Sequence, residues 1–321
     1  MVHALSIDVE DWYHDFLVDP RTPRESRVEA NTLGVLDILE AHGVRATFFF
    51  LGEVAERFPA LVRRVVAAGN EVGSHGYRHY PVTRMTRREF LTDVARSLRA
   101  IEDAIGRPVL GYRAPYFSIN AGVHWPIDIL KELGVRYDAS VLPIDRPPGM
   151  DLVCGRKPFR HANGLWEIPV ATLQLLTFLH LPLASGNGLR WLPRRLRRRW
   201  VGRFERDIGA GVFYVHPWEF DPGSPVAPRL SRWFLRVGRR RLPERFRELL
   251  RETSFAPIVE VFAAQLGDAA VPALVERHPR VRSGLAWRSA SAAQLECVSW
   301  WPWPEPPRRP GSYTCRRRSE T

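Results

Sequence analysis

Short apolar runs alternate with amphipathic stretches through the first two-thirds of the chain. Apolar residues at helical spacing predict helices, and the capping box Thr86-Arg87-Arg88-Glu89 opens one whose apolar stripe is Phe90, Val94, Leu98 and Ile101. The repeated strand–helix order predicts an α/β fold with a parallel sheet or barrel and helices outside. The expected strands are 2–8, 44–51, 71–73, 109–112, a short one near 135, 165–169 and 211–215. The other expected helices are 30–42, 53–68 and 126–133.

The length of 321 residues allows two domains of about 150 residues or one barrel of about 250 residues. The composition changes near the end of the chain. The segments Trp300–Pro307 and Arg316–Arg318 show neither helical nor strand periodicity. We therefore expect a catalytic domain over residues 1–262 and a poorly ordered tail over 263–321, for which the sequence predicts no function.

The cellular location is predicted from what the chain contains. No apolar run reaches the roughly 18 residues that a membrane-spanning helix needs. The first four residues lead directly into a strand, which leaves no room for a signal peptide at this end. Three scattered cysteines do not form a disulfide framework. The sequence is thus typical of a cytoplasmic protein.

Positive charge is concentrated in one region. The chain has 47 basic and 35 acidic residues, a net charge of +12, and the excess lies mostly between Arg190 and Arg251. There an apolar stripe at every fourth residue, from Leu192 to Ile208, is flanked by arginines. Such a helix either lies peripherally on an anionic membrane at the inner face or packs its stripe into the core with a solvated basic face. The second interpretation is the simpler one, and no motif predicts nucleic-acid binding.

Ionisable residues gather where the predicted strands end. Asp8, Glu10 and Asp11 follow the first strand, either as a metal ligand with a general base or as a solvated acidic loop. His75 and His79 follow the third strand, four residues apart, so that one helical turn would bring both imidazoles to one side. Two imidazoles and a carboxylate make a facial triad that leaves positions open for water and substrate.

Two further clusters fall at the same predicted edge. The segment Gly111-Tyr112-Arg113-Ala114-Pro115-Tyr116-Phe117 presents Arg113, which is suited to hold a carboxylate ionised; a turn with an ordinary ion pair is the alternative. His216 follows the last strand in Val215-His216-Pro217-Trp218-Glu219. An isolated histidine is usually structural, but the carboxyl ends of parallel strands are where barrel enzymes assemble their sites.

Together these clusters resemble the polysaccharide deacetylases, a family of metal-dependent carbohydrate esterases. The resemblance runs from about residue 2 to residue 220. Asp138-Ala139-Ser140, Trp166-Glu167-Ile168-Pro169 and His216-Pro217-Trp218-Glu219 are similar to a branch found with exopolysaccharide biosynthesis and exosortase systems, which extends it to about residue 262. The family fold is a distorted (β/α) barrel with fewer than eight strands.

The resemblance implies a metal site and a base. Asp8 matches the catalytic base, while His75 and His79 match the metal-binding histidines. The family form has two adjacent aspartates, but Val9 follows Asp8 here, so the acidic ligand is Glu10 or Asp11. Alternation along a strand favours Glu10, because residues two apart share a face. The implied cofactor is a divalent metal, with Zn²⁺ the first candidate.

The other implied roles complete a hydrolytic centre. Arg113 matches the arginine that orients the base, Tyr116 the residue whose backbone N–H helps hold the oxyanion, and His216 the catalytic acid. Ser74 and Trp218 would line the pocket. The expected reaction is hydrolysis of the N-acetyl amide of an amino sugar in a polysaccharide or its lipid-linked precursor.

The sequence is compatible with two other classes of function. One is hydrolysis of a C–N bond in a small cyclic amide or ureide, as in relatives that lack the full metal set. The other is a non-catalytic glycan-binding protein, which would be expected to lack one of Asp8, His75, His79 or His216. All four are present, so the deacetylase ranks first.

Overall fold

A computed structural model of the chain describes residues 1–14, 24–119, 123–143, 155–174, 180–181, 184–223 and 237–267. The strands are β1 (Val2–Val9), β2 (Thr47–Phe50), β3 (Glu71–Ser74), β4 (Gly111–Tyr112), β5 (Tyr137–Asp138), β6 (Phe159–Arg160), β7 (Trp166–Glu167), β8 (Leu173–Gln174), β9 (His180–Leu181), β10 (Val212–Val215) and β11 (Ser254–Ala256). The helices are α1 (Val28–Ala41), α2 (Gly52–Arg57), α3 (Pro59–Ala67), α4 (Arg87–Ile105), α5 (Pro126–Glu132), α6 (Gly186–Trp191), α7 (Arg194–Asp207), α9 (Leu242–Glu252), α10 (Ile258–Val261) and α11 (Ala263–Leu266).

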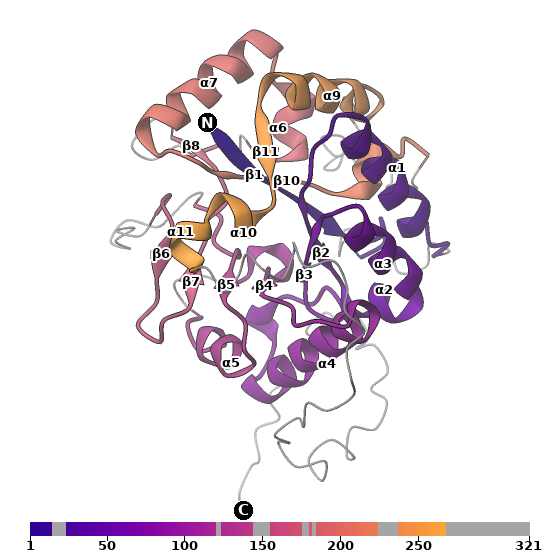
Figure 1. Cartoon of the computed structure of the whole chain (residues 1–321), viewed down its shortest axis with the longest axis vertical. Helices are drawn as coiled ribbons and strands as arrows, with labels where there is room; N and C mark the ends of the chain where they lie inside the picture. Colours follow the sequence, from indigo (N-terminus) through magenta and orange to yellow (C-terminus); the bar gives the residue numbers. More distant parts are fainter. Residues whose placement is uncertain are drawn as a thin grey trace, which may run out of the picture. The chain divides into compact units, whose positions relative to one another are not determined.

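A curled sheet forms the centre of the fold, with helices α1 to α5 around its outside (Figure 1). The strand order is β10-β1-β2-β3-β4-β5-β7-β6, and β11 pairs with β1. All these pairings are parallel except β6 with β7. The two sides of the curl meet where Val170 bridges Val212 in parallel, and the N–H of Ala171 donates to the carbonyl of Val212 at 3.0 Å. The expected distorted barrel is confirmed.

Two apolar clusters divide the core. The larger lies between the sheet and its helices and includes Leu36, Phe48 and Phe90. The smaller lies inside the curl, where Phe49 and Tyr137 pack with Ile258 of α10. Because successive strand residues face opposite ways, Phe48 and Phe49 serve different clusters. Helix α10 thereby covers the amino end of the strands and leaves their carboxyl end for the site.

Most predicted elements are confirmed, with one break in a helix. The capping box forms at Thr86, whose side chain accepts from the N–H of Glu89 while Glu89 accepts from the N–H of Thr86. The single helix expected over 53–68 is wrong: it divides at Phe58 into α2 and α3. Pro59 disfavours the helical conformation of the residue before it, and Phe58 adopts φ −128° and ψ 58°.

The arginine-rich segment packs as the simpler interpretation expects. Phe204 of α7 is buried, and Leu192, Trp200 and Ile208 pack partly buried against the larger core cluster. The apolar stripe therefore packs into the core, and the solvent-facing side of α7 carries its arginines except Arg197, which is buried. Among the described residues, none of the helices combines the length and apolarity required to span a membrane.

The expected domain limit falls near the end of the described chain. Residues 263–266, the first of the expected tail, form α11. Residues from 268 onward, including Trp300–Pro307 and Arg316–Arg318, lie outside the described residues.

Candidate active site

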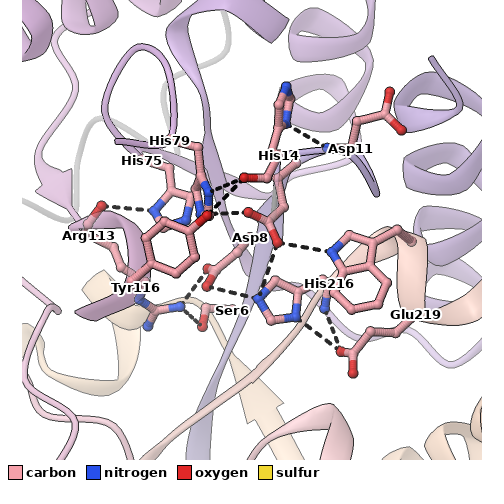
Figure 2. Close-up of polar contacts among 12 residues, drawn as sticks. Ser6, Asp8, Asp11, His14, His75, His79, Arg113, Tyr116, His216 and Glu219 are labelled. Carbon is pink, nitrogen blue, oxygen red and sulfur yellow. Dashed lines mark hydrogen bonds and ion pairs between the residues drawn. The ribbon is translucent and has the colours of Figure 1, made fainter. Parts of the chain in front are cut away.

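Four segments far apart in the chain meet at the carboxyl ends of the central strands (Figure 2). Asp8 lies near the end of β1 and Glu10 just after it, while His75 follows β3 and Arg113 follows β4. These residues share the inward-facing register of their strands, because Asp8 pairs with Phe49 and Phe49 with Gly73. The predicted clusters are thus brought together by the parallel sheet.

Asp8 is held by a buried arginine. Nη1 of Arg113 donates to Oδ1 of Asp8 at 2.6 Å and to Oγ of Ser6 at 2.7 Å. Its Nε donates to the carbonyl of Ala139 at 3.1 Å, and its guanidinium lies 4.4 Å from the centroid of the Phe49 ring. Both groups are essentially inaccessible to solvent, so each is the buried ionic partner of the other. This ion pair fixes the direction of the Asp8 carboxylate.

Glu10, His75 and His79 form a group suited to a metal ion, here called the metal-type group. One ligand atom from each residue lies within 4.8 Å of the others. Nδ1 of His75 is 2.8 Å from the carbonyl of Arg113, and Nδ1 of His79 is 3.1 Å from the carbonyl of His14. Those contacts leave both Nε2 atoms as the ligand atoms. All three residues are buried.

The donor set fits a divalent cation. Oε2 of Glu10 is buried without a hydrogen bond, although it lies 2.6 Å from Nε2 of His79. Burial lowers the pKa of His75 to about 4, which keeps this imidazole in its neutral, metal-binding form. Burial opposes ionisation of Glu10, but the charges of His79 and His216 outweigh it and hold the pKa of Glu10 below its usual range. Burial lowers the pKa of His79, but the charge of Glu10 outweighs it and raises this pKa, so a cation that binds here has to displace the proton of His79.

The loop between the two histidines is not the helical turn that their spacing predicted. Gly76 has φ +74° and His79 φ +52°, so the chain turns through left-handed positions instead. The carboxylate of Asp93 accepts from the N–H of Tyr77 at 2.7 Å and holds this turn. The prediction that the two imidazoles lie together holds, with ring centroids 5.1 Å apart, but the helix is wrong.

Of the two acidic ligands predicted, the structure places Glu10 and not Asp11 in the metal-type group. Asp11 accepts through Oδ1 from the N–H of Trp12 at 3.0 Å and through Oδ2 from the N–H of Arg27 at 3.0 Å. Its carboxylate therefore joins the loop after β1 to the start of α1. β1 ends at Val9, and in the loop that follows the carboxylate of Glu10 faces His79, whereas that of Asp11 faces the backbone of Arg27.

His216 lies opposite the Arg113 side of Asp8. Its Nε2 is 3.9 Å from Oδ2 of Asp8 and 3.7 Å from Oε1 of Glu10. Its Nδ1 is 3.2 Å from Oε2 of Glu219, which also accepts from the backbone N–H of His216 at 3.0 Å. Burial lowers the pKa of His216, but the charges of Glu10, Glu219 and Asp8 outweigh it and raise the pKa to about 9. The imidazole is positioned and charged as a proton donor.

Tyr116 lies over the metal-type group. Its hydroxyl donates to the carbonyl of His14 at 2.9 Å, and its ring centroid is 4.4 Å from that of His79. Tyr116 and Phe117 have φ of +56° and +51°, which non-glycine residues rarely adopt. The segment after Arg113 is therefore held in a conformation that the surrounding contacts must maintain.

Several residues of the site have little or no signal in the sequence. Glu219 stands in the His216 motif without a predicted role, and its spacing of three residues is the signal for the contact with His216. Trp218 was expected only to line the pocket, but its Nε1 donates to Oε1 of Glu10 at 2.9 Å. Arg190 lies 3.4 Å from Glu219 and has no local signal, nor has the carbonyl of His14. Apart from the contact between Glu219 and His216, these contacts depend on segments distant in the chain.

The fold and site define a distorted β/α barrel protein with a candidate metal centre and an ion-paired carboxylate at the carboxyl ends of its strands. Residues 21–137 match the family model described as polysaccharide deacetylase. Residues 139–263 match a model described as a domain of unknown function, DUF3473. The segment 21–137 is thus similar to the polysaccharide deacetylases over about a third of the chain. The second matched segment supplies β10 and His216 to the same site.

Characterised relatives match parts of the chain. A peptidoglycan-N-acetylglucosamine deacetylase from Bacillus cereus is 30% identical over 144 residues, covering 40% of this chain and 52% of the relative. A chitooligosaccharide deacetylase from Sinorhizobium fredii is 39% identical over 107 residues, covering 29% and 50%. The peptidoglycan-N-acetylglucosamine deacetylase PgdA of Listeria monocytogenes is 37% identical over 92 residues, covering 29% and 20%. The chain thus spans about half or less of the length of these relatives.

One solved structure shows the same fold over most of the chain. It is a Mycobacterium smegmatis protein assigned to the polysaccharide deacetylases, with a TM-score of 0.55 and 20% sequence identity. The match covers 88% of this chain and 94% of the other. The likeness therefore includes the segment that matches the domain of unknown function as well as residues 21–137.

Proposed function

We propose that the protein is a metal-dependent deacetylase that hydrolyses the N-acetyl amide of an amino sugar in a polysaccharide or its lipid-linked precursor. The observation that carries the proposal is the placement of the Asp8–Arg113 pair beside the Glu10, His75 and His79 group, with His216 on the other side. Deacetylation of N-acetylated glycans is named for the relatives that match residues of this chain.

The residues divide the reaction into proton acceptance and proton donation. Glu10, His75 and His79 would hold a divalent cation, which when bound lowers the pKa of water and polarises the acetyl carbonyl. Asp8, fixed by Arg113, accepts the proton of the attacking water. His216 donates a proton to the nitrogen of the leaving amino sugar, so that acetate and a free amine result. The backbone N–H of Tyr116 donates to the developing oxyanion.

Two finer assignments belong to this proposal. Zn²⁺ is the first candidate metal, because two imidazoles and one carboxylate with open positions are typical of catalytic zinc. Exopolysaccharide biosynthesis in the cytoplasm is the expected setting, supported by the motifs around Asp138, Trp166 and His216. Reconstitution of the metal-free protein with single divalent ions would rank the metals, and assays on lipid-linked and polymeric N-acetylated glycans would identify the setting.

Peripheral attachment to an anionic membrane would be purely electrostatic. The stripe from Leu192 to Ile208 packs against the core, so insertion of an apolar face is not available, whereas Arg195, Arg198 and Arg199 are exposed on α7. Salt-sensitive pelleting with phosphatidylglycerol vesicles tests this contact. An absence of binding at low salt would contradict it.

Metal content and acetate release test the proposed function together. For the wild type we expect one bound metal and release of acetate from N-acetylglucosamine oligomers, and for His75→Ala the loss of both. His124→Ala, at an exposed histidine outside the site, is the matched control and should retain both. Metal without acetate release from any N-acetylated glycan, but with hydrolysis of a cyclic amide or ureide, would favour the second class of function.

A further inference from the structure

A second group of buried ionisable residues lies on the opposite face of the sheet from Asp8. Asp138 ends β5 and Glu167 ends β7, and the two residues are direct partners in the parallel pairing of these strands. Asp138 pairs on its other side with Tyr112, whose neighbour Arg113 faces the site. Both carboxyl groups are 0% exposed. The proposed mechanism assigns neither of them a role.

The carboxyl groups of Asp138 and Glu167 accept too few hydrogen bonds to stabilise two negative charges. Oδ1 of Asp138 accepts from the hydroxyl of Ser140 at 2.5 Å, and Oε1 of Glu167 accepts from the N–H of Val141 at 2.9 Å. The remaining oxygens, Oδ2 of Asp138 and Oε2 of Glu167, are buried without a donor from another residue. Two adjacent buried carboxylates do not both ionise, and one proton between them satisfies both remaining oxygens.

The groups that face this pair do not replace that proton. His161 approaches from beyond β6, but its Nε2 is 3.7 Å from Oε2 of Glu167, which is too long for a hydrogen bond. Burial lowers the pKa of His161, which keeps the imidazole neutral. Burial raises the pKa of Asp138 well above its ordinary value, as does the charge of Glu167. Burial likewise raises the pKa of Glu167, to about 7.

The pair is connected to the site through Ser140. The hydroxyl that donates to Asp138 accepts in turn from the N–H of Ala114 at 2.7 Å. Ala114 stands between Arg113 and the η2 turn (Pro115–Phe117), which carries the left-handed Tyr116. Residue Ala139, between Asp138 and Ser140, gives its carbonyl to Arg113. The strand end that carries Asp138 thus holds the backbone that follows Arg113, through Ser140, and the side chain of Arg113, through Ala139.

We propose that Asp138 and Glu167 share one proton and act as positioning residues, holding through Ser140 the segment that carries Arg113 and Tyr116. The consequence for catalysis rests on the proposed function, whereas the positioning itself does not. One protonated carboxyl group beside one carboxylate suits this place. The pair supplies a fixed acceptor for Ser140 and carries one negative charge behind Arg113 instead of two.

Three variants test separately the proton shared by Asp138 and Glu167, the acceptor for the Ser140 hydroxyl, and the hydroxyl itself. Asp138→Asn keeps an acceptor for Ser140 and supplies a permanent N–H donor to Glu167, so it should behave as the wild type. Asp138→Leu removes both. Ser140→Ala removes only the hydroxyl, and its small volume change keeps the experiment informative if Asp138→Leu fails to fold.

Hydrogen exchange at the Ala114 amide is the readout that does not depend on activity. We expect faster exchange in Ser140→Ala and Asp138→Leu, and unchanged exchange in Asp138→Asn. The infrared spectrum of the wild type should contain a carboxylic acid C=O stretch at neutral pH that is absent in Asp138→Asn. Unchanged exchange in Ser140→Ala, or equal acceleration in Asp138→Asn and Asp138→Leu, would overturn the proposal.

Kinetics then test the catalytic consequence. We expect Ser140→Ala to lower kcat for acetate release about tenfold, the effect of one lost buried hydrogen bond, with KM and metal content unchanged. The Asp138→Asn variant should retain the wild-type kcat. If the wild type releases no acetate while the exchange and infrared results are as expected, the proposed function fails and the positioning role stands.

Discussion

The two ends of the barrel interior both contain buried carboxyl groups, but the groups that contact these carboxyls differ. At the carboxyl end, Asp8 contacts the guanidinium of Arg113, and Glu10 lies among histidines. At the amino end, Glu71 accepts hydrogen bonds from neutral groups. These donors are the hydroxyls of Thr47 and Tyr137, at 2.5 and 2.7 Å, and the N–H of Val259 at 3.2 Å.

The charged partners account for the difference in chemistry. Burial raises the pKa of Glu71, because the hydroxyls that contact it do not compensate fully for the loss of water. Glu71 instead joins β2, β3 and β5 to α10 and so closes the amino end of the barrel. A buried carboxylate can accept a proton in catalysis when a cation holds it ionised, whereas one surrounded by hydroxyls contributes mainly to the fold. Substitutions at both ends test this contrast.

Removal of the base should have the largest effect. Asp8→Asn keeps the shape of the side chain and a hydrogen bond to Arg113 but cannot accept a proton. We expect kcat to fall by roughly 10³- to 10⁴-fold while metal content is unchanged. Acetate release and metal analysis on the same preparation measure both quantities. Activity within tenfold of the wild type would show that Asp8 is not the base.

Removal of the acid should be nearly as severe, but only for poor leaving groups. His216→Gln should lower amide hydrolysis by about 10³-fold, because an amine leaves only when protonated. Hydrolysis of 4-nitrophenyl acetate should fall much less, since its leaving group needs no proton. Equal losses for amide and ester would instead assign His216 a structural role.

At the amino end the loss should appear in stability. Glu71→Ala leaves the hydroxyls of Thr47 and Tyr137 without this acceptor and should lower the free energy of unfolding by about 3 kcal/mol. Denaturant unfolding measures the change. The kcat of the folded protein should stay at the wild-type value, and a large drop in kcat with intact metal content would contradict the separation of the two ends.

A smaller effect, on metal affinity, is expected at Trp218, which contacts Glu10 of the metal-type group. Trp218→Phe keeps a ring stacked on His216 but removes the N–H that donates to Glu10. Metal affinity should fall by about tenfold, as is common when a hydrogen bond to a ligand is lost. Competition with a chelator gives the affinity. Trp191→Phe, at an exposed tryptophan, is the matched control.

The smallest effect is the pH dependence that Glu71 contributes. Its pKa in the folded protein lies above the ordinary value of 4.5, so the folded state binds the proton more tightly than the unfolded state. The corresponding stability is fully present below pH 4.5 and is lost as pH rises through the folded pKa. Glu71→Gln should lack this decrease. The difference in unfolding free energy between the two proteins, measured across this range, tests the sign.

The same geometry shows how the two segments that match family models, 21–137 and 139–263, form one barrel. The segment 139–263 supplies β10, which pairs with β1, and contributes His216, Glu219 and Arg190 to one end of the interior. The same segment contributes Val259 to the other end. It therefore completes the barrel that begins with β1, and its function is expected to be inseparable from that of residues 21–137.

The sequence by itself determined the repeated strands, the capped helix α4 and the gathering of Asp8, His75, Arg113 and His216 at one edge. Local hydrophobic periodicity and the common direction of parallel strands suffice for these features. The tertiary structure decided the rest: Glu10 over Asp11, the left-handed loop between His75 and His79, and the partners Arg190 and Glu167. Each of these depends on which distant groups share a buried volume, because desolvation makes a polar group adopt the contacts available there, and sequence spacing does not contain that information.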